Sequence, residues 1–384
     1  MTTLETSARG PKKILITGSS GYIGQHLIAS LARDGIAVKS RHAAGEDEQY
    51  EVFCGYRSLP TFETDLDQLV RETLALHPSI AKIKAFQLDF ESDCLSAIRR
   101  ACGESVDVII HLAALSSPVY CELHPDEAWK INVPLDLLSF GAPIIYMSTD
   151  QVYQGTQKFY RENDDTLPVN VYGKTKLAFE RLLLLDSFFD RTKSILTDAE
   201  LQESDLPDYL SPVNLKHVKP NPRSVILRSS LVLGKPAPFR NGCNKGAFPS
   251  FLQFVESRLK SSTSTNYFIN EFRSVVHVED VVFAILHFTR QALARGNHES
   301  ASMTNDKVRI FNLGGSDRVS RHDLAMKVAT HLKLDATNVS GVDRPVGGGG
   351  VPSPADISMN VEKLTMEMSF DKMDGLEEIV NATF

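Results

Sequence analysis

The sequence predicts an α/β fold, a doubly wound parallel sheet with a smaller C-terminal lobe. Short apolar runs alternate with helical patterns along the first 234 of the 384 residues, which is typical of strand–helix–strand units. A turn with three glycines joins the first apolar run to the first helical pattern. After Gly234 the alternation breaks, which indicates a second structural unit.

Each predicted element is taken from the spacing of its apolar residues and from the turn residues that bound it. The apolar runs predict strands at 12–18, 37–41, 83–90, 106–114, 143–149 and 224–234. The patterns between them predict helices at 24–35, 94–102, 126–140 and 173–189. Beyond Gly234, a strand feeding a helix is expected over 272–288.

The expected organisation is a flexible tail, a sheet domain with two polar insertions and one returning segment, and a substrate-binding lobe. Connections as long as these two are usually insertions or lids. The flexible tail is expected at 1–11, and the sheet domain at 12–234 with insertions near 43–80 and 190–222. The segment 267–290 returns to the sheet domain, and the lobe comprises 235–266 and 291–384.

Composition narrows the class of protein. The net charge of −7 is spread along the chain, so neither nucleic acid nor an anionic membrane is expected as a partner. No apolar run approaches the roughly 20 residues of a membrane-spanning helix, and the first residues lack the apolar core of a secretory signal. The five cysteines form no CxxC pair, which argues against a disulfide framework or a zinc site. We therefore expect a cytoplasmic protein without a metal centre.

The glycine turn "TGSSGYIG" (17–24) predicts a dinucleotide site. It lies between a strand and a helix, where glycines permit a tight turn and a close approach of the backbone to a pyrophosphate. The helix N-terminus then offers free N–H groups to the anion. The predicted cofactor-binding residues of this turn are Gly18, Ser20, Gly21, Tyr22, Ile23 and Gly24.

The residues after the second predicted strand favour NADP(H), with NAD(H) as the alternative. An acidic residue there would bind the ribose hydroxyls of NAD, but this sequence offers Arg41 and His42. A guanidinium suits the 2′-phosphate of NADP. Asp89, with Phe90 beside it, is expected to meet the adenine.

Two small residues, Ala113 and Ala114, end the fourth predicted strand and leave room for a dinucleotide. They complete the set of expected cofactor contacts.

Tyr172 and Lys176 lie four residues apart at the start of a predicted helix, so both face the same side. A nearby ammonium stabilises a phenolate and lowers the pKa of a tyrosine from about 10 toward neutral pH. Tyr172 is therefore a candidate proton donor to a carbonyl group. Thr149 ends the fifth predicted strand, Asp150 follows it, and both are candidates for the same catalytic site.

Taken in order, "TGSSGYIG", "HLAA", "STDQVY" and "YGKTK" resemble the motifs of extended short-chain dehydrogenase/reductases. Within that superfamily, "STDQVYQG", "NVYGKTKLAFE" and "FNLGGSDRVSR" most resemble the dTDP-4-dehydrorhamnose reductase family, which includes the regulatory beta subunit of methionine adenosyltransferase. The resemblance implies a Rossmann domain. It also implies that Thr149 hydrogen-bonds the substrate carbonyl, Tyr172 protonates it, and Lys176 also holds the nicotinamide ribose.

The identity of residue 151 helps to distinguish between the reactions known in this superfamily. Nucleotide-sugar 4,6-dehydratases carry Asp-Glu after the threonine, whereas this sequence has Asp150 and Gln151. An amide cannot usefully exchange a proton near neutral pH, so dehydration lacks one of its two acid–base groups. Epimerases typically have small residues at these positions, so Asp150 argues mildly against them. Simple carbonyl reduction remains.

The resemblance also places Arg273 on the nucleotide diphosphate of a substrate, with Asp150 in the same substrate pocket. A guanidinium is chemically suited to that anion. A salt bridge between Arg273 and Glu271 or Glu279 is an equally good interpretation of the same residue.

Three functions stay open at this point. The leading one is an NADP(H)-dependent reductase of a carbonyl compound, foremost a nucleotide-linked 4-keto-6-deoxy sugar. The second is a cofactor-binding regulatory beta subunit that docks on the catalytic subunit of methionine adenosyltransferase and performs little catalysis. The third is a nucleotide-sugar epimerase. A homo-oligomer is compatible with each.

Overall fold

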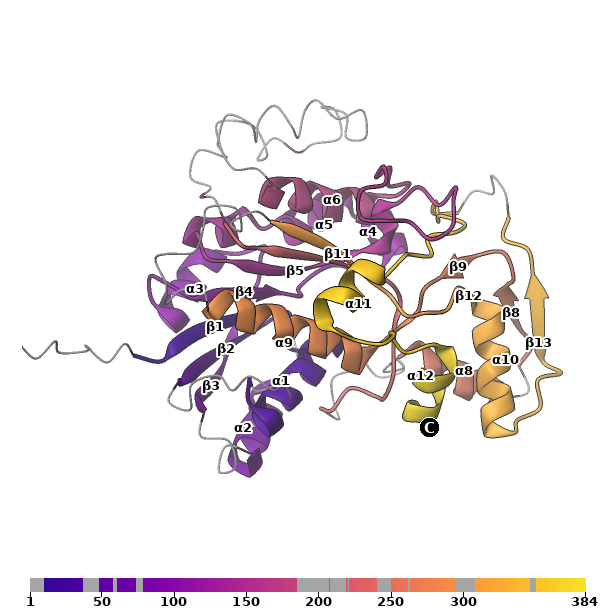
Figure 1. Ribbon diagram of the computed structural model, residues 1–384, viewed down its shortest axis with the longest axis horizontal. Coiled ribbons are helices and arrows are strands. Elements are labelled where there is room, and N and C mark those ends of the chain that lie inside the picture. The colour runs from indigo at the N-terminus through magenta and orange to yellow at the C-terminus, as the bar shows by residue number, and fades with distance from the viewer. Residues whose placement is uncertain are drawn as a thin grey trace, which may run out of the picture.

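The computed structural model has two parts, a sheet covered by helices and a smaller lobe beside it (Figure 1). The sheet has seven strands, all paired in parallel, which confirms the predicted α/β class. The structure describes residues 10–36, 48–57, 61–73, 79–184, 207, 219, 221–239, 250–261, 263–294, 308–345 and 350–384.

The strand order of the sheet is β11-β6-β5-β4-β1-β2-β3. The chain proceeds outward in one direction from β1 and then in the other from β4, so the order reverses between these two strands. In such doubly wound sheets, ligands bind beyond the carboxyl ends of the strands at that reversal. The strands are β1 Lys12–Thr17, β2 Tyr50–Tyr56, β3 Ile80–Gln87, β4 Val108–His111, β5 Ile144–Thr149, β6 Val225–Ser229 and β11 Arg309–Leu313.

Strand β1 shows why an apolar run forms the centre of this sheet. Successive side chains of a strand point to opposite faces. Ile14 and Ile16 accordingly join the core on one face and Leu15 the core on the other, all three with no exposed surface. Each contributes roughly 1.5–3 kcal/mol by burial. A polar residue at any of these positions would lie without a partner between two layers.

Helices cover both faces of the sheet, and Figure 1 shows α1 and α9 on one side and α4, α5 and α6 on the other. The first face packs on α1 Tyr22–Asp34, α2 Phe62–Thr73, α9 Val278–Ala294 and α11 Glu362–Met368. The second face packs on α3 Cys94–Cys102, α5 Pro125–Asn132, the 3-10 helix η1 Leu135–Phe140 and α6 Val171–Leu184, with α4 Pro118–Leu123 against α5 and α6.

The second strand of the sheet differs from the sequence prediction. The strand expected at 37–41 lies outside the described residues. The neighbour of β1 is β2, in register from Lys12 with Tyr50 to Thr17 with Gly55. This segment had been assigned to a polar insertion near 43–80, which in the structure also contains α2. The residues that flank "YEVFCGY" are polar, so the segment was assigned to an insertion although most of its side chains are buried.

Two further elements differ from their predicted assignments. Strand β11 had been placed in the lobe, but it pairs in parallel with β6 and forms one edge of the central sheet. The helix expected over 126–140 is interrupted after Asn132 and resumes as η1 at Leu135. Pro134 lies in this gap, and proline lacks the N–H that a continuous helix needs.

The lobe has its own apolar core between its helices and a two-stranded parallel pair. Two short pairs lie between the lobe and the main sheet, β7 with β10 in parallel and β9 with β12 antiparallel. The lobe elements are α8 Phe251–Lys260, β8 Thr265–Phe268, α10 Arg321–Leu332, β13 Val339–Val342 and α12 Leu376–Thr383. The short strands are β7 Val232–Leu233, β9 Phe272–Arg273, β10 Val276–His277 and β12 Val319–Ser320.

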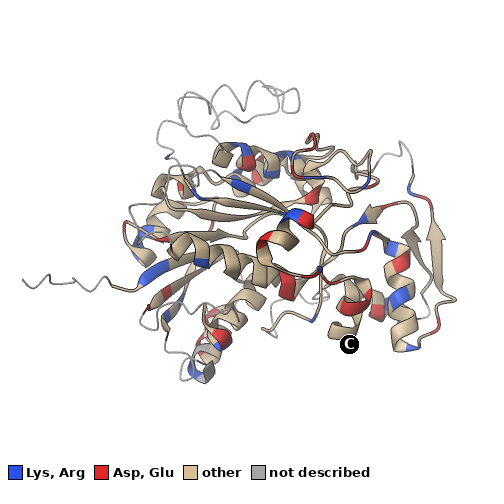
Figure 2. Ribbon diagram, viewed as in Figure 1, with Lys and Arg blue, Asp and Glu red and all other residues tan. Residues whose placement is uncertain are grey.

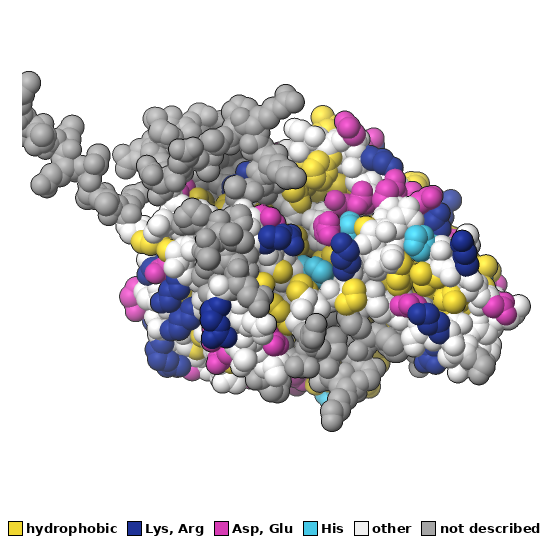
Figure 3. All heavy atoms as spheres, turned by 90° about the horizontal axis from the view of Figure 1, so that it is seen from below, with side chains coloured by type: hydrophobic (Ala, Val, Ile, Leu, Met, Phe, Trp, Pro, Cys, Tyr) yellow, Lys and Arg dark blue, Asp and Glu magenta, His cyan; other side chains and the backbone are white. Residues whose placement is uncertain are grey.

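Charged residues lie mainly on helices and loops, and the strands of the central sheet carry few of them (Figure 2). Acidic and basic side chains are interspersed on the face shown in Figure 3. Among the helices that the structure describes, none is both long enough and apolar enough to cross a bilayer.

Candidate active site

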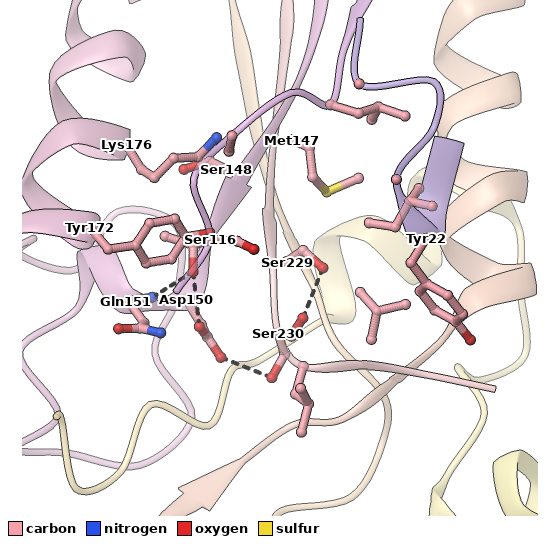
Figure 4. Close-up of a pocket in the computed structure, with 18 of the residues that line it drawn as sticks. Tyr22, Ser116, Met147, Ser148, Asp150, Gln151, Tyr172, Lys176, Ser229 and Ser230 are labelled. Carbon is pink, nitrogen blue, oxygen red and sulfur yellow. Dashed lines mark hydrogen bonds between the residues drawn. The ribbon is translucent and has the colours of Figure 1, made fainter. Parts of the chain in front are cut away.

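A cavity of about 380 Å³ opens where the strand order reverses, between the sheet and the lobe. Eleven of the predicted site residues line it. They are Gly18, Gly21, Tyr22, Ile23, Gly24, Ala114, Thr149, Asp150, Tyr172, Lys176 and Arg273. Figure 4 shows Tyr172 and Lys176 on one side of this cavity and Tyr22 on the other.

The glycine turn after β1 packs so closely that side chains would not fit. Gly18 has a φ of 69°, and a Cβ on it would lie 2.6 Å from the backbone nitrogen of Ala113. A Cβ on Gly24 would lie 2.5 Å from the carbonyl oxygen of Gly18. Real Cβ atoms do not approach other atoms so closely, so the turn requires glycine at both positions. The turn therefore has the compact backbone of a dinucleotide-binding loop.

Helix α6 carries Tyr172 and Lys176 into the cavity. Gly173 lets this helix approach the loop after β5, since a Cβ there would lie 2.3 Å from the carbonyl oxygen of Gln151. Asn132 on α5 donates from Nδ2 to the hydroxyl of Thr175 at 2.9 Å. Thr175 lies between Tyr172 and Lys176, so this bond fixes the turn of helix that bears both.

Thr149 at the end of β5 and Asp150 at the start of the short 3-10 helix η2 Asp150–Val152 face the same cavity. The hydroxyl of Thr149 donates to Asp150 at 3.2 Å and accepts from the backbone N–H of Gln151 at 3.2 Å. The other carboxylate oxygen of Asp150 accepts from Ser230 at 2.9 Å (Figure 4). Asp150 is thus held at both oxygens.

The expected lowering of the Tyr172 pKa by Lys176 is wrong for this structure. Burial raises the pKa of Tyr172, because the phenolate would lose its hydration, and a hydrogen bond with Thr149 opposes the shift only in part. The Lys176 ammonium lies instead over the ring of Tyr146, 4.3 Å from its centroid. Burial also lowers the pKa of Lys176 to about 7, which leaves its charge incomplete at neutral pH. Tyr172 is accordingly protonated throughout the neutral range.

Asp150 carries a second perturbed pKa at the cavity. Its burial raises the pKa to about 6, while the charge of Arg273 and the hydrogen bonds from Ser230 and Thr149 oppose that rise. Asp150 therefore changes its charge close to physiological pH. Perturbed groups of this kind gather at functional sites.

The remaining predicted cofactor residues lie away from the cavity lining. Ser20 accepts from Gln25 through its carbonyl oxygen at 2.8 Å, and Ala113 packs against Gly18. Phe90 is buried with its ring against His111, at a centroid distance of 5.9 Å. Asp89 accepts from the backbone N–H of Glu91 at 3.0 Å. The roles of Asp89 and Phe90 toward an adenine stay predictions.

Arg41 and His42 lie outside the described residues. In the structure, the residue that follows β2 is Arg57, whose side chain is 44% exposed. Its guanidinium lies 2.5 Å from Glu91, 3.4 Å from Glu127 and 3.7 Å from Asp89. Sequence reasoning missed Arg57 because it missed β2. The unbroken apolar run within "YEVFCGY", buried from Val52 to Gly55, was the signal that could have found both.

Arg321 and the pair Ser229 and Ser230 also line the cavity and were not predicted. Ser229 is the last residue of β6, Ser230 follows it, and Arg321 is the first residue of α10. The two serines reach the cavity at the end of a central strand, whereas Arg321 reaches it through the packing of the lobe against the sheet. Among the described residues, no group of three or more His, Cys, Asp or Glu side chains could hold a metal ion.

The sheet order, the glycine turn and the Tyr-Lys helix at one cavity together define an extended short-chain dehydrogenase/reductase. Residues 12–188 match the family model described as the RmlD substrate binding domain. Methionine adenosyltransferase 2 subunit beta of Xenopus tropicalis is 32% identical over 361 residues, which cover 92% of this chain and 81% of that protein. The chain therefore belongs to the dTDP-4-dehydrorhamnose reductase family, which includes these beta subunits.

The subunit of the same name from Bos taurus is 31% identical over 180 residues, which span 45% of this chain and 43% of the bovine protein. A hypothetical dTDP-4-dehydrorhamnose reductase from Sulfolobus tokodaii superposes with a TM-score of 0.61 at 21% identity, over 97% of this chain and 99% of that chain. The Bacillus anthracis dTDP-4-dehydrorhamnose reductase in complex with NADP gives a TM-score of 0.61 at 18% identity, over 97% and 98%. Both reductase structures therefore have the same fold as this chain.

Proposed function

We propose that this protein is an NADP(H)-dependent reductase of a carbonyl compound. The observation that carries the proposal is the convergence of Thr149, Tyr172 and Lys176 on one cavity beside the glycine turn. The three side chains come from two separate elements, the end of β5 and helix α6. A solely structural cavity would not require this combination.

The cofactor site rests on the glycine turn after β1. A Cβ on Gly18 or Gly24 would clash with backbone atoms of the chain, so only glycine allows the compact loop at the helix N-terminus that suits a pyrophosphate. When bound, the nicotinamide supplies a hydride. Lys176, on the opposite wall, would hold its ribose. NADP(H) is favoured over NAD(H) because the structure has a guanidinium, that of Arg57, directly after β2. Arg57 is half-exposed, and it would exchange its surface pairs with Glu91 and Glu127 for the 2′-phosphate.

A substitution of Arg57 tests the proposed preference for NADP(H) over NAD(H). Replacing Arg57 with alanine should weaken NADPH binding about tenfold or more and change NADH binding little, since it removes a charge-assisted hydrogen bond to the 2′-phosphate. The measurement is a fluorescence titration with each nucleotide. Arg41→Ala, at the position that the sequence first suggested, should then leave the preference unchanged.

Equal affinities of the wild-type protein for NADPH and NADH would contradict this assignment. A loss of the preference in Arg41→Ala alone would return the role to that residue. Arg33→Ala serves as the control, because Arg33 is exposed at the end of α1 and pairs with Asp34 at 3.0 Å.

The residues of the chain have distinct tasks in the proposed reduction. The hydroxyl of Tyr172 would bind the carbonyl oxygen and give it the phenolic proton. Thr149 would turn its single hydroxyl proton from Asp150 to the same oxygen when the substrate binds. The raised pKa of Tyr172 keeps this proton in place until the oxygen becomes basic. Asp150 and Ser230 orient Thr149 through the hydrogen bonds described above.

Within this proposal, the substrate is a nucleotide-linked 4-keto-6-deoxy sugar. The structure holds Gln151 as a hydrogen-bonding group, since its Oε1 accepts from Asn170 at 2.9 Å. An amide so held has no acid–base role. Incubation with dTDP-glucose and NAD should therefore give no 4-keto-6-deoxy product by mass spectrometry, and Gln151→Glu alone should not create one. A dehydrated product from the wild-type protein would refute this interpretation of Gln151.

A regulatory subunit of methionine adenosyltransferase is the second candidate. It is favoured by the 32% identity to the Xenopus tropicalis subunit along 92% of this chain. In that function the protein would bind the catalytic subunit, and the cofactor site would serve binding rather than turnover. Copurification with a methionine adenosyltransferase catalytic subunit, alongside a screen of keto-sugar nucleotides for NADPH oxidation, distinguishes the two candidates.

A further inference from the structure

The lobe side of the cavity carries two arginines, Arg273 on β9 and Arg321 at the start of α10. Both are permanently charged, and both could contact an anionic group of a substrate. Their surroundings differ in the number of contacts that each guanidinium already makes within the protein.

The guanidinium of Arg273 is largely engaged by the protein itself. Its Nη1 donates to the carbonyl oxygen of Phe272 at 2.8 Å, and its Nη2 donates to Glu271 at 3.2 Å and to Ser353 at 3.5 Å. Its side chain is 8% exposed, and the charge of Asp150 acts on it from the cavity. Arg273 therefore serves first to pair with the buried carboxylate of Glu271 and to balance the charge of Asp150.

Arg321 is placed differently. Its side chain is 34% exposed, and its Nε lies 3.5 Å from Glu271. The guanidinium lies over the ring of Phe251, 4.9 Å from the centroid. Contact with a ring face fixes the plane of a guanidinium and leaves its edges able to donate. A capping box between Ser320 and Asp323 fixes the first turn of α10 and with it the base of this side chain.

We propose that Arg321 is the residue that binds an oxyanion of the substrate, a phosphate or a carboxylate, at the lobe end of the cavity. Arg273 and Glu271 form the support behind it. Since Asp150 and Glu271 already balance two positive charges here, the site suits one oxyanion at Arg321 rather than a dense polyanion. The proposal rests on the proposed function in that it takes this cavity as the substrate site.

The test is calorimetric titration of the NADPH-saturated protein. The anionic probes are thymidine 5′-diphosphate and glucuronate, and thymidine and glucose are their uncharged counterparts. We expect at least one anion to bind more tightly than its counterpart, and the one that binds identifies whether the oxyanion belongs to a nucleotide or to a sugar acid. Arg321→Gln should weaken that binding about tenfold or more, and Arg321→Lys should retain part of it.

Lys327→Gln is the matched control, because Lys327 lies on the same helix and pairs with Glu377 at 2.9 Å outside the cavity. It removes the same charge and should leave anion binding unchanged. The inference is wrong if Arg321→Gln behaves like this control, or if the wild-type protein prefers neither anion. It is also wrong if Arg273→Gln abolishes anion binding with an unaltered melting temperature while Arg321→Gln does not.

NADPH binding is measured first, in the same titration. Tight NADPH binding without anion binding overturns only the role of Arg321, whereas failure to bind NADPH overturns the proposed function itself.

Discussion

Tyr172→Phe should lower reductase turnover by about 10²-fold or more, the scale on which enzymes lose a general acid. The substitution removes one hydroxyl from a buried ring and keeps the ring, so the packing of α6 should change little. NADPH affinity should stay within a few-fold of the wild type, since the phenol is proposed to act on the substrate carbonyl. Turnover is followed by NADPH oxidation and affinity by fluorescence titration.

The same variant separates the two candidate functions. A regulatory subunit should keep its binding to the methionine adenosyltransferase catalytic subunit, and it has no turnover to lose. Lys176→Ala should weaken cofactor binding in either case. Tyr120→Phe is the control, because Tyr120 donates to Glu127 at 2.7 Å outside the cavity. An unaltered reductase rate in Tyr172→Phe would show that the catalytic assignment is wrong even though the fold is right.

The sequence predicted the parts of the site that are local in the chain. The glycine turn with Gly18 and Gly24, and the pair Tyr172 and Lys176, are each contained within eight residues, so their spacing determines which side chains lie together. Thr149 was found because it ends an apolar strand. These residues do line one cavity.

The features that the sequence did not predict depend on contacts between distant segments. Strand β2 is recognisable as a sheet member through its pairing with β1, and Arg57 is placed only once β2 is known. Arg321 reaches the cavity through the packing of the lobe. The pKa of Tyr172 follows from burial, which the four-residue spacing to Lys176 cannot report.

Breaking the buried ion pair behind α6 should be one of the most destabilising single changes in this protein. Glu180 on α6 and Arg228 on β6 meet at 2.8 Å, with side chains 0% and 4% exposed. Arg228 also donates to the hydroxyl of Tyr153 at 3.0 Å, and Ser148 of the cavity wall donates to Glu180. The pair thus joins β5, β6 and α6 directly beneath the site.

Arg228→Met should reduce the free energy of unfolding by about 3–5 kcal/mol, because it leaves the Glu180 carboxylate buried without its partner. Urea denaturation measures the change. The double substitution Arg228→Met with Glu180→Leu should recover much of the loss, since it removes the uncompensated charge as well. Arg33→Met, which breaks an exposed pair with Asp34, should have no measurable effect. If Arg228→Met costs no more than this control, the pair does not hold the sheet and α6 together.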